Sequence, residues 1–302
     1  MLKKQVSKDN EIPTKEQFSS LLEHYQNGRF NDAEKLAISI TQEFPKYPFG
    51  WKVLGVLLKQ MDKKAEAVIA NEKAVEFSPQ DAEAHNNLGI TLQELGRLEE
   101  AKASYTQAIA FKSDYAEAYY NLGITLQELG KLDEAEACYR QAIRVKPDYT
   151  DVHYNLGYTL KELGRLEEAE ASYIQAITFK PDYAEAHNNL GITRQQLGKL
   201  NEAKASYTQA IAFKPDYAEA HSNLGAALQE LGKLEEAEAN YIQAIAFKPD
   251  YAEAHYNLGI TLQELGKLDE AEACYRQAIR FKPDYADVHY NLGFMLKELG
   301  RL

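Results

Sequence analysis

Seven asparagines recur in the chain at intervals of 34 residues, each at the start of an Asn-Leu-Gly triplet. A carboxamide carries an oxygen that accepts and an NH2 that donates hydrogen bonds, so it matches the two polar groups of a peptide main chain, whatever the side chains are. We therefore predict that these residues bind an extended polypeptide. In the alternative interpretation, each amide bonds to the neighbouring unit and sets the twist of the array. The row comprises Asn87, Asn121, Asn155, Asn189, Asn223, Asn257 and Asn291.

Carboxylates recur in two further rows on the same predicted surface. If they line a binding groove, they favour basic or Ser/Thr-rich peptides over acidic ones. Alternatively, they belong to a solvated helix face. The first row comprises Glu83, Glu117, Asp151, Glu185, Glu219, Glu253 and Asp287. The second comprises Glu94, Glu128, Glu162, Glu230, Glu264 and Glu298.

Paired acids such as Glu235 and Glu236 also recur, but no nucleophile accompanies them. Acids in this position are typical of a first helical turn, where they complement the helix dipole. General acid and base chemistry would need a distinct reacting partner within hydrogen-bond reach. We therefore predict no catalytic residue within the 302 residues.

Six histidines recur at the position that Trp51 occupies in an earlier unit. A metal site needs several ligands converging on one ion, whereas these side chains lie one or more units apart. We predict packing histidines at the helix seam, and neither a metal ion nor another cofactor. The histidines are His85, His153, His187, His221, His255 and His289.

Composition narrows the class of partner and the compartment. The net charge is -12, and residues 82–302 hold 22 basic against 34 acidic side chains. Because phosphate attraction supplies most nucleic-acid affinity, nucleic acid and anionic membrane are excluded as predicted partners.

The N-terminal residues have no apolar run of a signal peptide, and no later stretch reaches the roughly 18 apolar residues of a membrane span. Cys138 and Cys274 lie four units apart, so we predict free thiols in a reducing, cytoplasmic protein.

The period of 34 residues divides the chain. We expect a disordered segment over 1–13, two divergent units over 14–81, six regular units over 82–285, and the first helix of a ninth unit over 286–302. Ser19 and Val53 stand at the asparagine position in the divergent units, which we therefore interpret as a cap. The later units begin at Ala82, Ala116, Thr150, Ala184, Ala218, Ala252 and Ala286.

Each unit contains two predicted helices. The first ends at a glycine such as Gly266, which can adopt a left-handed backbone, and the second ends before Pro283. Small residues Gly259 and Ala271 allow the two helices to approach closely. On a helical wheel, the side toward the partner helix holds Leu258, Gly259, Leu262 and Leu265. The opposite side holds Glu253, Tyr256, Asn257, Ile260 and Glu264.

These repeated residues resemble the tetratricopeptide repeat (TPR) family over residues 14–302. The pattern is His255-x2-Leu258-Gly259, then Ala271-x3-Tyr275 and Pro283. The resemblance implies an all-α, right-handed superhelical solenoid of helix-turn-helix repeats, whose first helices line a concave groove that holds a protein or peptide. TPR proteins that clamp a terminal carboxylate use lysine and arginine in the groove, and residues 82–302 lack them at those positions.

The Asn-Leu-Gly triplets most resemble the TPR superhelix of O-linked N-acetylglucosamine transferase, where a row of asparagines holds the backbone of the substrate peptide. This leaves two alternatives to a simple binding scaffold. The chain could be the substrate-selecting arm of a longer glycosyltransferase that continues past Leu302. It could also be a structural solenoid that associates with itself through its uncapped C-terminal helix.

Two local features depart from the repeat. Arg194 stands where other units have a core leucine, and we interpret it as harmless drift, its long stem reaching the rim. Residues 286–302 lack a second helix to cover Leu292, Leu296 and Leu299. Since solenoids normally end in a polar capping helix, we expect the 302 residues to be a fragment.

Overall fold

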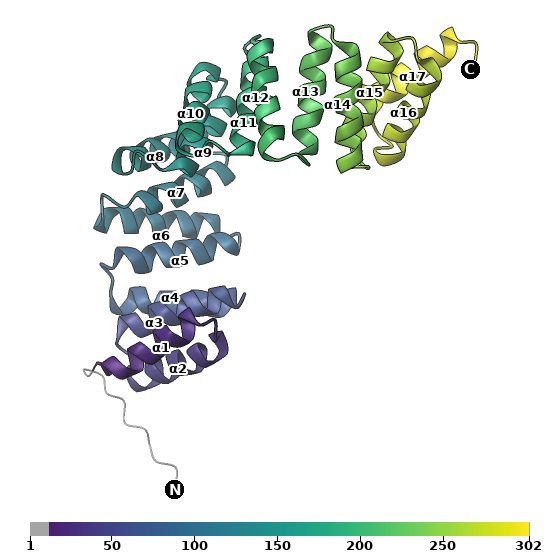
Figure 1. Ribbon diagram of the computed structural model, residues 1–302. Coiled ribbons are helices and arrows are strands. Elements are labelled where there is room, and N and C mark those ends of the chain that lie inside the picture. Colours follow the sequence, from purple (N-terminus) through teal and green to yellow (C-terminus); the bar gives the residue numbers. More distant parts are fainter. Residues whose placement is uncertain (1–11, 302) are drawn as a thin grey trace. The chain divides into compact units, whose positions relative to one another are not determined.

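The computed structural model describes residues 12–301, which form seventeen α-helices and no strand (Figure 1). The predicted all-α class of helix-turn-helix repeats is thereby confirmed. The helices are α1 Lys15–Gln26, α2 Phe30–Glu43, α3 Pro48–Gln60, α4 Lys64–Phe77, α5 Ala82–Glu94, α6 Leu98–Phe111, α7 Ala116–Glu128, α8 Leu132–Val145, α9 Thr150–Glu162, α10 Leu166–Phe179, α11 Ala184–Gln196, α12 Leu200–Phe213, α13 Ala218–Glu230, α14 Leu234–Phe247, α15 Ala252–Glu264, α16 Leu268–Phe281 and α17 Ala286–Glu298.

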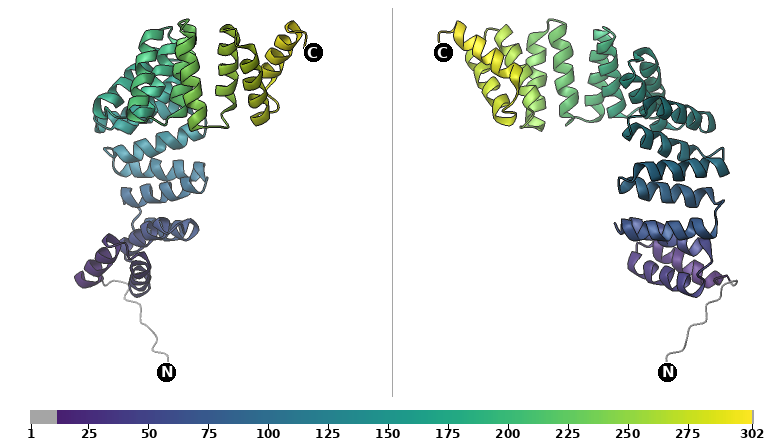
Figure 2. Two further views of the ribbon diagram at one scale, coloured as in Figure 1. Left: turned by 45° about the vertical axis from the view of Figure 1, so that its right-hand side comes forward. Right: turned by 180° about the vertical axis from the view of Figure 1, so that it is seen from behind.

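The helices divide into two compact units, Met1–Asp148 and Tyr149–Leu302. Within each unit, every helix packs against the next one along the chain, so that neighbouring helices run antiparallel (Figure 2). The first helix of each regular repeat begins at the predicted start, as α15 does at Ala252. Of the segment predicted to be disordered, residues 1–11 lie outside the described residues, and Pro13 is buried.

A glycine ends the first helix of each regular repeat. Gly266 has a φ of 76°, a left-handed conformation that costs little without a Cβ atom. The following residue, Lys267, donates its backbone N–H to the carbonyl of Leu262 at 2.8 Å, and so satisfies one of the last carbonyls of the helix. In the second repeat Asp62 takes this place, with a φ of 59°.

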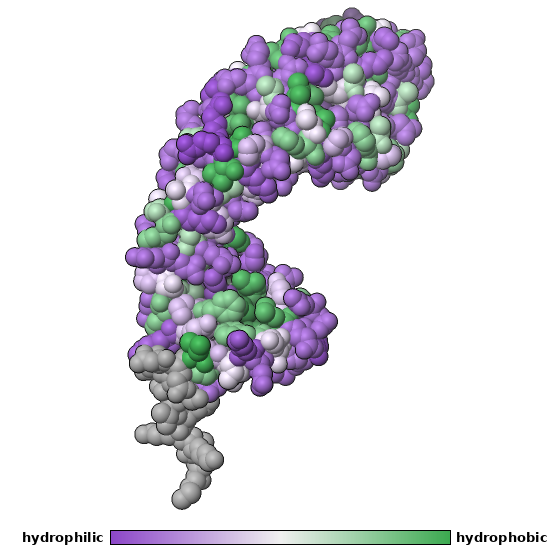
Figure 3. Space-filling view, turned by 60° about the vertical axis from the view of Figure 1, so that its left-hand side comes forward, coloured by the Kyte–Doolittle hydropathy of each residue, from purple (hydrophilic) through white to green (hydrophobic). Residues whose placement is uncertain are grey.

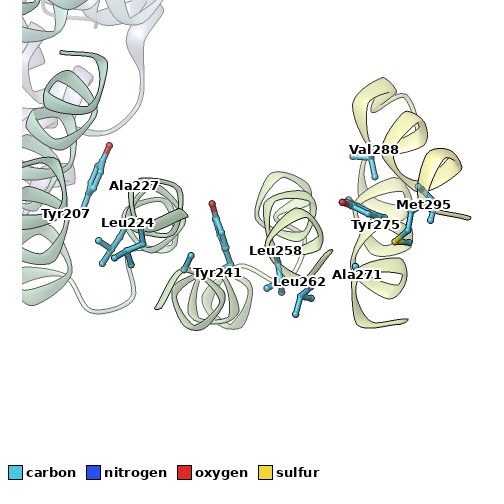
Figure 4. Close-up of a cluster of buried hydrophobic side chains, with 14 of the residues drawn as sticks. Tyr207, Leu224, Ala227, Tyr241, Leu258, Leu262, Ala271, Tyr275, Val288 and Met295 are labelled. Atoms are coloured by element: carbon cyan, nitrogen blue, oxygen red, sulfur yellow. The ribbon is translucent and has the colours of Figure 1, made fainter. Parts of the chain in front are cut away.

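A glycine and a tyrosine meet in the seam between paired helices. The side chain of Tyr275 is fully buried, and a Cβ atom added to Gly259 would lie 2.6 Å from its ring carbon Cε1. The predicted seam is confirmed, since Leu258, Leu262 and Ala271 are also buried there. In the second unit, tyrosine rings and leucines from successive helices form one hydrophobic cluster (Figure 4).

The structure also buries a polar side chain of the first helix. Thr261 is fully buried, and its hydroxyl donates to the backbone carbonyl of Asn257 at 2.9 Å. The helical wheel did not place this threonine among the buried side chains, because threonine counts as a polar residue. Its bond to the carbonyl four residues earlier satisfies the hydroxyl within the helix, so that its methyl group can pack.

The last helix covers one of the three leucines that the sequence led us to expect to be exposed. Leu292 is 8% exposed, and Met295, one turn later, is 2% exposed. The exposed apolar side chains of α17 are instead Tyr290 and Phe294, at 73% and 50%. The prediction holds in part, because Leu296 and Leu299 are only half-buried, whereas Leu262, the counterpart of Leu296, is buried. Leu292 is covered because it belongs to the cluster that includes Tyr275 and Ala278 of α16.

Candidate functional site

The candidate site is the surface that the first helices of successive repeats form within each compact unit, which we call the A face. The seven predicted asparagines are all half-buried, and those of the hollows described below lie on this face. On α15, Glu253 and Glu264 are exposed, while Tyr256, Asn257 and Ile260 are half-buried. The side of the helix predicted to face a ligand therefore is the accessible side.

Several of the asparagines bond to the preceding repeat. Asn189 Nδ2 donates to the hydroxyl of Tyr154 at 2.9 Å, and Asn223 Nδ2 donates to Asn188 Oδ1 at 3.0 Å. Asn121 and Asn291 make the same bond, to Asn86 Oδ1 at 3.2 Å and to the Tyr256 hydroxyl at 3.0 Å. At these positions the NH2 group therefore bonds to the neighbouring repeat, as the alternative interpretation predicts. The structure brings each amide to its neighbouring repeat, and a ligand would meet mainly the carboxamide oxygens.

A chain of hydrogen bonds crosses from the core to the A face. The buried hydroxyl of Tyr241 donates to Gln229 Oε1 at 3.4 Å, and Gln229 Nε2 donates to Glu264 Oε1 of the next repeat at 3.0 Å. Gln93 makes the corresponding bond to Glu128 at 2.9 Å, and Gln195 pairs likewise with Glu230. This chain holds carboxylates of the second acidic row in place.

Hollows occur on the A face at one repeated register. Each lies between two successive first helices, with the tyrosine of the intervening second helix at its base. One of about 440 Å³ is lined by Ile192, Gln195, Gln196, Tyr207, Asn223, Ala226 and Glu230. Another of about 460 Å³ is lined by Ile260, Gln263, Glu264, Tyr275, Tyr290, Asn291 and Phe294. Asparagine, carboxylate and aliphatic side chains therefore share one surface.

Two acids of the first row are paired with a lysine of their own repeat. Glu185 lies 3.2 Å from Lys214 Nζ, and Glu219 lies 3.1 Å from Lys248 Nζ. Burial alone would raise the pKa of Glu219, but its hydrogen bonds, including the one from Lys248, outweigh burial and lower it. At these two positions a lysine of the same repeat therefore offsets the charge of the acid.

The histidines are packing residues, as predicted. His255 Nε2 lies 3.0 Å from the carbonyl oxygen of Pro249, and its ring stacks on Phe281 with centroids 5.6 Å apart. Trp51 makes the same contact, donating from Nε1 to the carbonyl of Pro45 at 2.7 Å. No group of metal-binding side chains occurs among residues 12–301.

The two cysteines are half-buried and unpaired. Burial raises the pKa of Cys138 and of Cys274 to about 11. Since the thiolate is the reactive form, neither thiol is poised for nucleophilic chemistry at neutral pH.

The two N-terminal repeats carry an apolar part of the A face, where we expected only a cap. A hollow of about 160 Å³ there is lined mainly by apolar side chains of α1 and α3, among them Leu21, Leu22, Tyr25, Phe49, Val53 and Val56. Hydrophobic side chains gather on the surface of these repeats (Figure 3). The sequence held the signal, because Phe49 and Val53 occupy positions that regular repeats give to acids and asparagines.

Comparison with known families agrees with this architecture. A TPR repeat model matches residues 92–130, 157–198, 194–232, 227–266 and 261–300. Tetratricopeptide repeat models match 116–149, 70–103 and 138–171. The chain belongs to the TPR family. No curated protein matches this TPR chain.

Solved TPR structures are similar to the chain. YrrB, whose structure is described as "a TPR protein with an unusual peptide-binding site", is 28% identical over 61% of this chain and 95% of that chain, with a TM-score of 0.55. MamA is 24% identical over 55% of this chain and 97% of that chain, with a TM-score of 0.52. PilF of Pseudomonas aeruginosa is 20% identical over 71% of this chain and 98% of that chain, with a TM-score of 0.61. None of the described TPR helices is long and apolar enough to cross a membrane.

Proposed function

We propose that this TPR chain is a scaffold that holds an extended polypeptide on its A face. The observation that carries the proposal is the repeated hollow, in which an asparagine, a carboxylate and an aliphatic side chain recur together. Such a set contacts main chain and side chains without transforming them, and equal spacing favours a long ligand. The likeness to the peptide-binding protein YrrB supports the same class of function.

The charge of the A face supports a basic or Ser/Thr-rich segment as the ligand. Glu230 and Glu264 line the two large hollows, and each carboxylate accepts a hydrogen bond from a neutral glutamine rather than from a cation. A ligand cation can therefore add the missing opposite charge.

The alternative of a substrate-selecting arm, attached to a glycosyltransferase, rests on the asparagine row alone. Sequencing the gene past the codon of Leu302 tests it: a catalytic domain in the same reading frame supports it, and a stop codon removes it. Self-association through α17, where Tyr290 and Phe294 are exposed, is tested by light scattering across concentration.

A peptide array separates binding from structural roles of the asparagines. Synthetic peptides graded in net charge are screened first, and the tightest one is titrated by calorimetry against the variant in which Asn189, Asn223 and Asn257 are all alanine. We expect a loss of about 2–4 kcal/mol, or roughly 30- to 1000-fold in affinity, if three hydrogen bonds are lost nearly additively.

The matched control removes the partners of the amides and keeps the amides. Tyr154→Phe and Asn188→Ala take away the groups to which Asn189 and Asn223 donate. This double variant should melt earlier, as the triple variant should, but should retain its peptide affinity. Equal loss of affinity in both variants would mean that the asparagines act only by stabilising the array.

A further inference from the structure

The apolar hollow between α1 and α3 has the register of the large hollows of the A face but a different chemistry. Val53 stands there at the position of the asparagine row, and Phe49 stands at the position of the first acidic row. Tyr25 stands where most regular repeats have a glutamine, such as Gln263. Three positions that are polar in the regular repeats therefore carry apolar or aromatic side chains in this hollow.

The base of this hollow is formed by a leucine rather than by a tyrosine. Leu21, which is 1% exposed, stands at the glycine position of the repeat, and Ala37 of α2 stands at the tyrosine position. In the two large hollows a tyrosine hydroxyl bonds to a glutamine of the wall, as Tyr207 does to Gln195. The volume of about 160 Å³ is close to that of an apolar cavity of about 150 Å³ that holds benzene. The hollow therefore suits one large apolar side chain.

Aromatic contacts hold the walls of the hollow in place. The ring of Phe49 packs edge-on against Phe18, with centroids 5.1 Å apart, and the ring of Tyr25 packs edge-on against Phe30, with centroids 5.9 Å apart. Leu22, Tyr25 and Phe49 nevertheless remain 45%, 36% and 37% exposed. Because the walls are ordered before a ligand binds, little of the binding free energy is lost in ordering them.

The lysine that lines the hollow is bound by two carboxylates of the chain. Lys52 Nζ lies 3.0 Å from Asp81 Oδ2 and 2.6 Å from Glu83 Oε2. Two carboxylates against one ammonium group leave this rim with a net negative charge, which disfavours a ligand carboxylate and favours a basic segment. The rim therefore suits the same class of polypeptide as the proposed function.

The asparagine beside the hollow is open to a ligand. Other members of the row donate to the residue 35 positions earlier, as Asn223 does to Asn188. For Asn87 that position holds Lys52, which binds its two carboxylates, and the carboxamide of Asn87 has no hydrogen-bond partner among residues 12–301. Both the oxygen and the NH2 group of Asn87 can therefore bond to the main chain of a ligand.

We propose that the hollow between α1 and α3 binds a phenylalanine or leucine side chain of a basic polypeptide, whose main chain bonds to Asn87. The proposal rests on the proposed function, since the side chain belongs to the ligand held on the A face. It adds one position at which the chain selects its ligand by an apolar side chain rather than by charge.

The test moves a phenylalanine along a basic peptide. The tightest basic peptide of the array is synthesised with phenylalanine or alanine at each position in turn, and every version is titrated by fluorescence anisotropy. We expect one position at which phenylalanine binds roughly tenfold more tightly than alanine, because its ring leaves water. Val53→Asn and Phe49→Glu each install the residue type of the regular repeats, and either variant should bring this ratio of affinities close to one.

Two further variants separate the hollow from its surroundings. Ile69→Asn makes the same kind of change at an exposed side chain of α4, outside the hollow, and should keep the roughly tenfold preference. Asn87→Ala should weaken the phenylalanine and alanine versions by the same factor. A preference that persists in both Val53→Asn and Phe49→Glu, or that occurs at no peptide position, would overturn the proposal.

Toluene, the side chain of phenylalanine, probes the hollow without a peptide through the NMR shifts of the Tyr25 and Val53 backbone amides. We expect saturable shifts in the wild type and roughly tenfold weaker binding in Val53→Asn and Phe49→Glu. Tighter toluene binding in the full-length Leu2→Ser/Val6→Ser variant would make residues 1–11 the occupant, and a dimer that Val53→Asn dissociates would make it a second copy; either result overturns the proposal. If toluene binds and no array peptide does, the scaffold function fails and this proposal with it. If peptides bind without the phenylalanine preference, this proposal alone fails.

Discussion

The guanidinium Nε of Arg194 lies 2.8 Å from Glu170 Oε1, in a seam where the other regular repeats have leucine. Arg194 also donates to Ser206 Oγ at 2.9 Å, and Lys199 Nζ donates to Glu170 Oε2 at 2.7 Å. Burial alone would raise the pKa of Glu170, but the hydrogen bonds from Lys199 and Arg194 outweigh burial and lower it. The arginine is therefore part of an ion-pair network between repeats. The prediction that Arg194 is a harmless substitution whose side chain reaches the rim is corrected accordingly.

Arg194→Leu should change the free energy of unfolding by less than about 1 kcal/mol. The gain from burying a leucine is about 1.5–3 kcal/mol, and the loss of a hydrogen bond between charged groups is of similar size. Two repeats later, Leu262 stands at the position of Arg194, and Lys267 still donates to Glu238 there. The lysine–glutamate pair therefore does not require the arginine. Urea unfolding of Arg194→Leu, Glu170→Gln and the double variant should give a coupling energy of at least about 0.5 kcal/mol. Additive effects would contradict the network.

Glu170 should also make stability depend on pH. Because its pKa is lower in the folded than in the unfolded chain, its contribution is present above the ordinary value of 4.5 and is lost as the pH falls through the folded pKa. The wild type should exceed Glu170→Gln in urea midpoint by a constant amount above about pH 5 and lose that advantage below it. A difference that grows on acidification would exclude this assignment.

The seam glycines should respond oppositely to alanine, according to what faces them. Gly259→Ala places a Cβ atom 2.6 Å from Tyr275, whereas Gly293, at the same position of α17, has nothing within 4 Å. Overpacking costs about 1–3 kcal/mol, and alanine gains about 0.5–1 kcal/mol over glycine in a helix. Gly259→Ala should therefore lower the melting temperature and Gly293→Ala raise it. Stabilisation of both variants would mean that the tyrosine ring moves aside easily.

Periodicity predicts the elements of this fold because each repeat has the same local chemistry. The residues that end or pack the helices act within one repeat, so their roles follow from their spacing. Examples are Gly266, Pro283 and Ala271. The buried Thr261 was missed because its hydroxyl is satisfied by the backbone of its own helix. That bond depends on the side-chain rotamer, which the pattern of polar and apolar residues does not contain.

The candidate site was less predictable, since its hydrogen bonds join residues 35 apart, one position beyond the repeat. Asn223 and Asn188 illustrate this: two asparagines at different positions meet only when adjacent first helices pack side by side.

A final prediction concerns Tyr173, whose buried hydroxyl has no hydrogen-bond partner among the described residues. In other repeats this hydroxyl donates to a glutamine, as Tyr207 does to Gln195 at 2.9 Å, but the repeat of Tyr173 has Lys161 there. Lys161 Nζ lies 3.1 Å from Glu162 Oε1 and 5.1 Å from the ring centroid of Tyr158.

Removing an unpaired hydroxyl should cost nothing, so Tyr173→Phe should leave stability unchanged or raise it, while Tyr207→Phe should cost about 1 kcal/mol. Lys161→Gln should supply the missing acceptor and stabilise the chain by about 1 kcal/mol. In that background, Tyr173→Phe should become as costly as Tyr207→Phe, because a hydrogen bond now exists to be lost. Thermal melts of the four combinations at positions 161 and 173 measure this directly. If Tyr173→Phe is as costly in the wild type as Tyr207→Phe, the hydroxyl has a partner, and the proposed difference between these repeats does not exist.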